Sequence, residues 1–189
     1  MARPLRVEYP GAFYHVINRG NVGGDIFKSP RDREKFLEYL ETAASRFSIR
    51  IHTYCLMANH YHLLVETPEA NLSRAIQWIN VSYAVYFNFK RDRRGHLFQG
   101  RFKSILVDAD EYLKHLSRYI HLNPVRAKIV ESASDYPWSS YDYFIGKKKE
   151  PEWLETNWLL SQFGRLQKKA KKNYKNFVEQ VDAETLKNP

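Results

Sequence analysis

The order of strand-like and helix-like segments constrains this chain more than any other feature. Strands are predicted where β-branched and aromatic residues gather between turn signals, at residues 12–18, 49–57, 61–66 and 97–107. Helices are predicted where apolar residues recur at helical spacing, at residues 29–47, from 71 to about 87, and from Asp108 or Asp110 to Asn123. The third helix should end there, because a residue before proline avoids the helical region. The resulting order is β-α-β-β-α-β-α.

That order is the split βαβ arrangement of an α+β, ferredoxin-like (RRM-like) antiparallel sheet with helices on one face. We expect the first two helices to cover that face and the other face to be free to bind a ligand. Beyond residue 130 the chain is turn-rich at 134–141, and short helices are predicted at 151–163 and 166–181. We therefore divide the chain into a domain at 1–130 and a connector with a basic helical tail at 131–189, packed on the domain through Trp138, Trp153 and Trp158.

The positive charge of the chain is concentrated in two stretches. Lys and Arg total 30 against 21 Asp and Glu, which gives a net charge of +9. Residues 90–103 contribute +5 and residues 146–189 contribute +4. Such a surface, together with 15% aromatic residues, is typical of proteins that bind a polyanion through its phosphates and unpaired bases. A solvated, solubilising face explains the charge equally well.

Composition excludes several other classes of protein. A chain of 189 residues with 43% apolar residues can bury a sizeable core. No apolar run approaches the ~18 residues of a membrane span, and the first residues lack the apolar stretch of a signal peptide. We therefore expect a cytoplasmic protein without a membrane partner. Cys55 is the only cysteine, so an internal disulfide and a multi-thiolate zinc site are both excluded.

A pair of histidines lies at the start of the third predicted strand. His60 and His62 are separated by one residue, so on a strand their imidazoles project from the same face and can share one metal ion. Two surface histidines at a strand end would give the same pattern. The position of the pair, where a strand leaves a tight corner, favours the metal site.

A second candidate constellation lies at the end of the third predicted helix. Tyr119 and Asn123 are four residues apart, so both can face one bound ion or scissile group. Phenol is a poor nucleophile at its ordinary pKa of about 10, so this chemistry needs a cation and a positioned electrophile. The alternative is a half-buried helical tyrosine followed by an ordinary helix stop.

Basic residues in and before the fourth predicted strand form a candidate DNA contact. Strand alternation puts Gln99, Arg101 and Lys103 on one face, with Phe98 and Phe102 toward the core. Arg91, Arg93 and Arg94 precede them, and together these residues could follow a nucleic-acid backbone. A charged edge strand that resists aggregation is the alternative.

Five motifs occur in order along the chain, at residues 13–16 (FYHV), 18–21 (NRGN), 60–65 (HYHLLV), 99–104 (QGRFKS) and 119–127 (YIHLNPVRA). With a sixth segment at 137–141 (PWSSY), they cover about residues 5–141. On these motifs the chain resembles the single-tyrosine transposases of the HUH endonuclease superfamily, and most of all the branch called REP-associated tyrosine transposases.

The resemblance implies a role for each matching residue. His60 and His62 fall on the HUH histidines, with Tyr61 where a hydrophobic residue is usual. Tyr119 falls on the nucleophile, and Asn123 on a position where many relatives carry a glutamine as third metal ligand. Arg19 and Asn21 of the second motif join the expected DNA-binding set. The implied cofactor is a divalent metal ion, Mg²⁺ or Mn²⁺.

The implied activity is metal-dependent cleavage and rejoining of single-stranded DNA at hairpin-forming repeats, through a covalent 5′-phosphotyrosine. The protein would then associate with the nucleoid when bound to DNA. Relatives are monomers or dimers that exchange the tyrosine helix, so a homodimer is one of two expected states.

Three other functions fit the same sequence. A non-cleaving module of RRM-like fold would bind single-stranded nucleic acid through exposed aromatics. A metal-dependent nuclease would use water as nucleophile and tolerate the loss of Tyr119. An inactive descendant of a transposase would retain the motifs without the reaction.

Overall fold

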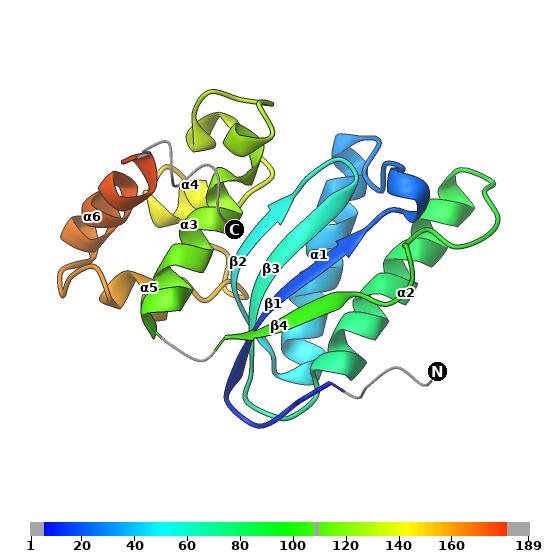
Figure 1. The fold of residues 1–189 in the computed structure, drawn as a ribbon, viewed down its shortest axis with the longest axis horizontal. Coiled ribbons are helices and arrows are strands. Elements are labelled where there is room, and N and C mark those ends of the chain that lie inside the picture. The colour runs from blue at the N-terminus through cyan, green and yellow to red at the C-terminus, as the bar shows by residue number, and fades with distance from the viewer. Residues whose placement is uncertain (1–5, 108–109, 181–189) are drawn as a thin grey trace.

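The computed structural model describes residues 6–107 and 110–180, and it has a four-stranded sheet with helices on both faces (Figure 1). The strands are β1 (Ala12–Arg19), β2 (Arg50–Leu56), β3 (His60–Thr67) and β4 (Lys103–Val107). The helices are α1 (Pro30–Phe47), α2 (Leu72–Lys90), α3 (Asp110–Arg126), α4 (Tyr141–Phe144), α5 (Asn157–Ser161) and α6 (Gln167–Glu179), with 3₁₀ turns at Asn21–Gly23 and Ala133–Asp135. The predicted element order of the α+β domain is confirmed.

The sheet is antiparallel throughout and has the strand order β2-β3-β1-β4. In its register Ile17 lies between His62 on β3 and Lys103 on β4. Strands β2 and β3 are buried along nearly their whole length, whereas β4 at the edge alternates between exposed and half-buried residues and is buried only at Val107. A strand is buried on both sides only when both faces of the sheet are covered. The central strands are therefore fixed from two sides.

Helices α1 and α2 pack on one face of the sheet, as predicted (Figure 1). Helix α1 begins at a capping serine, whose side chain accepts a hydrogen bond from the backbone N of Asp32 at 3.3 Å, and Pro30 occupies its first turn. Phe36 and Leu40 on the inner side of α1 are fully buried. Burying side chains of this size stabilises the domain by roughly 1.5–3 kcal/mol each.

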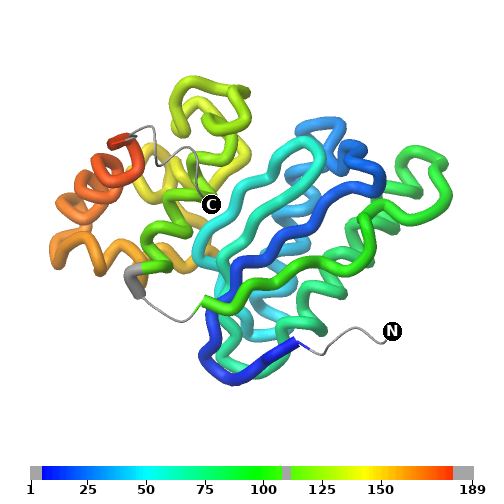
Figure 2. Tube along the Cα trace, in the orientation of Figure 1, coloured from blue at the N-terminus to red at the C-terminus, as the bar shows by residue number. Residues whose placement is uncertain are grey.

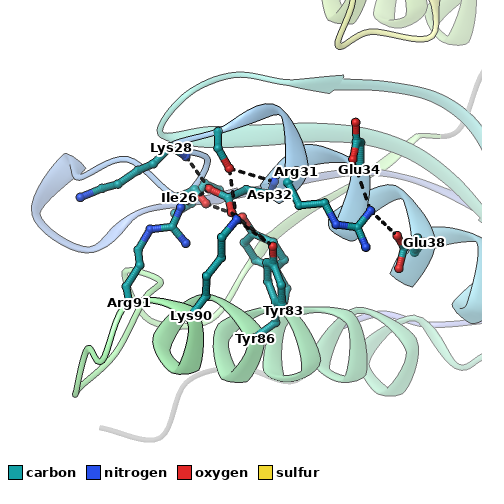
Figure 3. Close-up of polar contacts among 11 residues, drawn as sticks. Ile26, Lys28, Arg31, Asp32, Glu34, Glu38, Tyr83, Tyr86, Lys90 and Arg91 are labelled. Carbon is teal, nitrogen blue, oxygen red and sulfur yellow. Dashed lines mark hydrogen bonds and ion pairs between the residues drawn. The ribbon is translucent and has the colours of Figure 1, made fainter.

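A cluster of charged groups joins the start of α1 to the end of α2 (Figure 3). The buried carboxylate of Asp32 accepts hydrogen bonds from Lys90 Nζ at 3.0 Å, from the Arg91 guanidinium, and from the backbone N of Lys28 at 2.9 Å. Burial alone would raise the pKa of Asp32, but the hydrogen bonds from Lys90 and Arg91 outweigh it and lower the pKa to about 2. Asp32 is therefore ionised and paired at neutral pH.

Helix α3 covers the other face over β2 and β3, a face that the sequence analysis expected to be free. Leu116 and Ile120 of α3 are buried against Cys55 and Leu64 of the sheet. The helix also continues past the predicted stop, through Pro124 to Arg126. A proline in a helix removes one backbone donor, and this helix is held from both sides by packing. An open pocket remains on this face at the end of β1 and the start of β4.

The tail packs against the side of α3 that faces away from the sheet (Figure 2). His121 is fully buried between two hydroxyl groups. Its Nδ1 lies 2.7 Å from the Tyr174 hydroxyl oxygen, and its Nε2 lies 2.7 Å from the Ser140 hydroxyl oxygen. Tyr174 in turn donates to Ser117 at 3.2 Å. Trp138, Trp153 and Trp158 pack against the hydrophobic clusters, as predicted. The tail thus completes the core around α3.

Besides the end of α3, three other predicted boundaries are wrong. Residues 97–102 form a loop rather than the first half of β4. Their backbone forms hydrogen bonds with the end of β1 and the loop after it (Gln99 N to Arg19 O, 2.9 Å; Asn21 N to Leu97 O, 2.8 Å), and Gly100 has a φ of +73°. Helix α5 is shorter than predicted, and α6 ends within the described residues at Glu179. The predicted caps Asp108 and Asp110 have side chains outside the described part. None of the helices described here has the length and apolar character needed to traverse a bilayer.

Candidate active site

An open pocket of about 910 Å³ lies on the second face of the sheet, where β1 ends and β3 and β4 begin. Eight of the twelve residues singled out in the sequence line it: Arg19, His60, His62, Gln99, Arg101, Lys103, Tyr119 and Asn123. They come from three strands (β1, β3 and β4), one helix and the loop before β4. The fold therefore brings the two histidines, the tyrosine and half of the predicted DNA contacts to one place.

The corner before β3 is fixed by backbone hydrogen bonds to the loop after β1. Gly20 N donates to Asn59 O at 2.8 Å, and Ala58 O accepts from the backbone of Ile26 and Phe27 at 2.9 Å. At Gly20 a side chain is sterically excluded, since a Cβ would lie 1.8 Å from the carbonyl oxygen of Gly24. This tight loop sets the start of β3, and with it the position of His60.

His60 and His62 project from the same side of β3, as strand geometry predicted. Their ring centroids are 5.0 Å apart, and the rings are nearly perpendicular. His60 Nδ1 lies 2.7 Å from Asn59 Oδ1, and His62 Nδ1 lies 2.9 Å from His15 Nε2. Each Nδ1 therefore has a protein partner, which leaves the Nε2 atoms as the candidate ligand atoms.

The environment keeps these imidazoles neutral at neutral pH. Burial lowers the pKa of His62 well below its ordinary value, and the nearby His15, His60 and Arg126 lower it further. Burial, then the charge of Arg19, lowers the pKa of His60, and burial lowers the pKa of His15 to about 4. A neutral imidazole has the lone pair that a metal ligand needs.

Tyr119 is placed against the histidines by α3. Its ring centroid lies 5.7 Å from that of His62, and the two rings meet edge to face. The guanidinium of Arg126, two helical turns further on, lies 4.6 Å above the Tyr119 ring, a cation–π contact. Asn123 lines the same pocket, and its Nδ2 donates to Tyr119 O at 3.3 Å, a bond that leaves Oδ1 unused. The predicted shared face of Tyr119 and Asn123 is confirmed.

These residues fit a divalent cation. Within residues 6–107 and 110–180, no three His, Cys, Asp or Glu side chains form a group that could hold a metal ion. The candidate donors at the pocket are the Nε2 atoms of His60 and His62, and the amide oxygen of Asn123 is a candidate third donor. Mixed nitrogen and oxygen donors suit Mn²⁺, whereas Mg²⁺ prefers oxygen. So few protein ligands would leave coordination positions for a substrate oxygen.

Positively charged side chains surround the same pocket. Arg19, Arg101 and Lys103 line it with Gln99, although residues 99–101 are not on a strand and owe their position to the loop. Phe98 and Phe102 are buried, as predicted. Arg6 also lines the pocket, stacked 3.6 Å from the ring centroid of Phe102.

Four predicted DNA contacts lie elsewhere. Asn21 lines a neighbouring pocket that shares Arg6, Asn18, Arg101 and Phe102 with the first. Arg91 forms an ion pair with Asp32 (Figure 3). Arg93 donates to Asn88 Oδ1 at 2.9 Å and to the backbone O of His96 at 2.9 Å, and these two hydrogen bonds close the turn after α2. Arg94 lines neither pocket and lies in the same turn, exposed to solvent.

Four site residues were assigned no role from the sequence: Arg6, His15, Asn59 and Arg126. Arg126 could have been found from the sequence, because it lies seven residues after Tyr119. That spacing is about two helical turns and puts both side chains on the same helix face. His15 could not have been found, since its contact with His62 depends on the register between β1 and β3.

Comparison with known proteins shows the family of this chain. The family model described as "Transposase IS200 like" matches residues 9–123, a range that contains β1, the histidine pair and Tyr119. The chain belongs to the IS200-like transposase family. The resemblance to single-tyrosine transposases is confirmed by this match.

Relatives of this family member are described as REP-associated tyrosine transposases. One, from Haemophilus influenzae, is 29% identical over 109 residues, which cover 52% of this chain and 62% of that protein. The chain thus matches less than two thirds of that relative's length. A solved structure of a REP-associated tyrosine transposase bound to a REP hairpin superposes with a TM-score of 0.65 and 18% identity, covering 82% of this chain and 92% of that one. This second likeness shows a shared fold.

Proposed function

We propose that this IS200-like transposase cleaves and rejoins single-stranded DNA through a covalent bond between DNA and Tyr119. One observation carries the proposal: within a single chain, the Tyr119 ring lies 5.7 Å from His62 in an open pocket lined with cations. A binding module would need the cations but not a phenol beside two imidazoles whose Nε2 atoms are available.

In the proposed reaction the Tyr119 oxygen attacks a backbone phosphorus. The new O–P bond replaces the bond to the 3′ oxygen, which leaves with a proton as a free 3′-hydroxyl while the phosphate stays on Tyr119 as a 5′-phosphotyrosine. Attack by another 3′-hydroxyl reverses the step and joins strands. The phosphodiester energy is conserved in the intermediate, so no nucleotide cofactor is required.

His60, His62 and Asn123 would hold a divalent cation, Mg²⁺ or Mn²⁺. When bound, such an ion supplies Lewis-acid polarisation of the phosphoryl oxygen and a template for in-line attack. The protein's own part is to keep both imidazoles neutral and directed into the pocket. The packing of α3 fixes the nucleophile beside them, and Arg126 lies over its ring.

The substrate we propose is a single strand that folds into a hairpin, as in the REP hairpin bound by the structural neighbour. Arg6, Arg19, Arg101 and Lys103 line the pocket around the reacting groups and would neutralise backbone phosphates there. Because the nucleophile and both histidines belong to one chain, we propose that a monomer carries a complete site.

The decisive experiment is a test for a covalent adduct. The full-length protein is incubated with Mn²⁺ or Mg²⁺ and a 3′-labelled single-stranded hairpin from the DNA beside its own gene, and the products are separated under denaturing conditions. We expect a metal-dependent protein–DNA band in wild type that is absent in Tyr119→Phe. Tyr112→Phe is the matched control, because Tyr112 is an exposed tyrosine on the same helix, away from the pocket.

Three outcomes would contradict the proposal. A band that persists in Tyr119→Phe would place the nucleophile elsewhere. Cleavage without a covalent band would indicate a nuclease that uses water. Binding without cleavage of that substrate would indicate a single-stranded nucleic-acid binding module.

A further inference from the structure

The two candidate ligands differ in what holds their Nδ1 atoms. His60 Nδ1 faces the side-chain oxygen of Asn59, whereas His62 Nδ1 faces another imidazole, that of His15. We infer that His15 fixes the tautomer of His62 that presents a free Nε2 to a divalent cation, and so positions this ligand without touching the ion. The inference rests on the proposed use of a metal ion and adds a residue with no role in the family assignment.

The contact between His15 and His62 follows from the register of the sheet. His62 pairs with Ile17 and Leu64 pairs with His15, so His15 and His62 are diagonal neighbours on the same face. Their rings are stacked, with centroids 5.2 Å apart and an interplanar angle of 22°. His15 Nε2 is 2.9 Å from His62 Nδ1, and the two residues are only 5% and 4% exposed. Burial leaves little room for water to replace this hydrogen bond.

The direction of this hydrogen bond decides whether His62 can bind a metal through Nε2. A neutral imidazole has one nitrogen that donates and one that accepts. If His62 Nδ1–H donates to His15 Nε2, then His62 Nε2 has a free lone pair. If His15 Nε2–H donates instead, His62 carries its proton on Nε2 and that atom cannot be a ligand. Metal binding therefore requires His15 to be the acceptor, with its own proton on Nδ1.

His60 shows the same arrangement, but its Nδ1 faces the side-chain oxygen of Asn59, which can only accept a hydrogen bond. Asn59 Nδ2 donates to Gly23 O at 3.3 Å, which turns Oδ1 toward His60 Nδ1. His60 must then carry its proton on Nδ1 and leave Nε2 free. Outer hydrogen-bond partners of metal-binding histidines fix the tautomer and ring orientation, and their loss typically weakens metal binding 10–100-fold.

Two substitutions of His15 separate positioning from packing. His15→Gln retains an acceptor, because the amide oxygen of glutamine can reach the place of Nε2. His15→Phe retains a buried ring beside Tyr119, which lies 5.9 Å from His15 between centroids, but removes the acceptor. His52→Phe is the matched control, since His52 is another fully buried histidine of the same sheet and lies outside the pocket.

The first measurement is the tautomer of His62 in the metal-free, full-length protein, by ¹⁵N NMR of the ring nitrogens. We expect His62 to carry its proton on Nδ1 in wild type, His15→Gln and His52→Phe. In His15→Phe the proton should move to Nε2, where it can bind water in the pocket. A wild-type His62 protonated on Nε2 would overturn the inference.

The second measurement is binding of Mn²⁺ alone, by the loss of the free-ion EPR signal. His15→Phe should weaken binding 10–100-fold, while His15→Gln and His52→Phe should stay within about threefold of wild type. Equal affinity in His15→Phe and wild type would overturn the inference. If wild type and His60→Ala bind Mn²⁺ equally poorly, the metal part of the proposed function fails, and the tautomer measurement alone decides the role of His15. If His15→Phe does not fold, wild type and His15→Gln still decide it.

Discussion

Replacing Asp32 by asparagine removes the charge at the centre of the cluster that joins α1 to α2 (Figure 3). Its folded pKa is about 2, against an ordinary value of 3.8. Each unit of pKa difference corresponds to about 1.4 kcal/mol, so the ionised carboxylate stabilises the fold by about 2 kcal/mol at pH 7. Asparagine resembles the protonated carboxyl in shape. We therefore expect Asp32→Asn to lower the free energy of unfolding by about that amount.

The pH dependence of this effect makes the prediction specific. A depressed folded pKa contributes stability above the unfolded pKa and loses it as pH falls through the folded value. At pH 3 the contribution should be about 1 kcal/mol instead of about 2 kcal/mol. The assay is urea unfolding of wild type and Asp32→Asn at pH 7 and pH 3, followed by circular dichroism.

Glu34→Gln provides the control for Asp32→Asn. Glu34 lies on the same helix and pairs with Arg31, but both side chains are more than half exposed, and such pairs often contribute nothing measurable. A difference between wild type and Asp32→Asn that is equal at pH 7 and pH 3, or no larger than that of Glu34→Gln, would refute the reasoning.

Three further predictions test other parts of the molecule. Arg101→Ala should reduce the slope of log binding constant against log salt concentration by about 0.7 for single-stranded DNA, whereas Arg91→Ala should leave that slope unchanged and lower the unfolding free energy instead. His121 has a pKa of about 3 because it is buried, so wild-type stability should fall as pH drops below 6.5, when only the unfolded histidine binds a proton. Between pH 6.5 and pH 4, the free energy of unfolding of His121→Gln should fall by about 3 kcal/mol less than that of wild type, as measured by urea unfolding. Finally, a mixture of Tyr119→Phe and His60→Ala should form no covalent adduct, and recovered adduct would show that chains exchange α3.

The sequence predicted the element order and which candidate residues share a face, because both depend on local spacing. Alternation along β3 was enough to put His60 and His62 on one face, and helical spacing was enough to align Tyr119 with Asn123. The roles of Arg91 and His15 depend instead on contacts between distant elements. Arg91 is drawn to a buried carboxylate on α1, 59 residues away, and His15 meets His62 only through the strand register.

The predicted stop of α3 at Pro124 was wrong for a reason that bears on the site. Propensity near a proline is a local preference, and tertiary packing can override it. Here the sheet buries one side of α3, while the tail buries the other through His121, Tyr174 and Ser140. The additional helical turn carries Arg126, which reaches back over the Tyr119 ring. Exchange of α3 without the tail would break the buried hydrogen bonds of His121 to Tyr174 and Ser140, so we propose that the tail helps to hold Tyr119 beside the histidines.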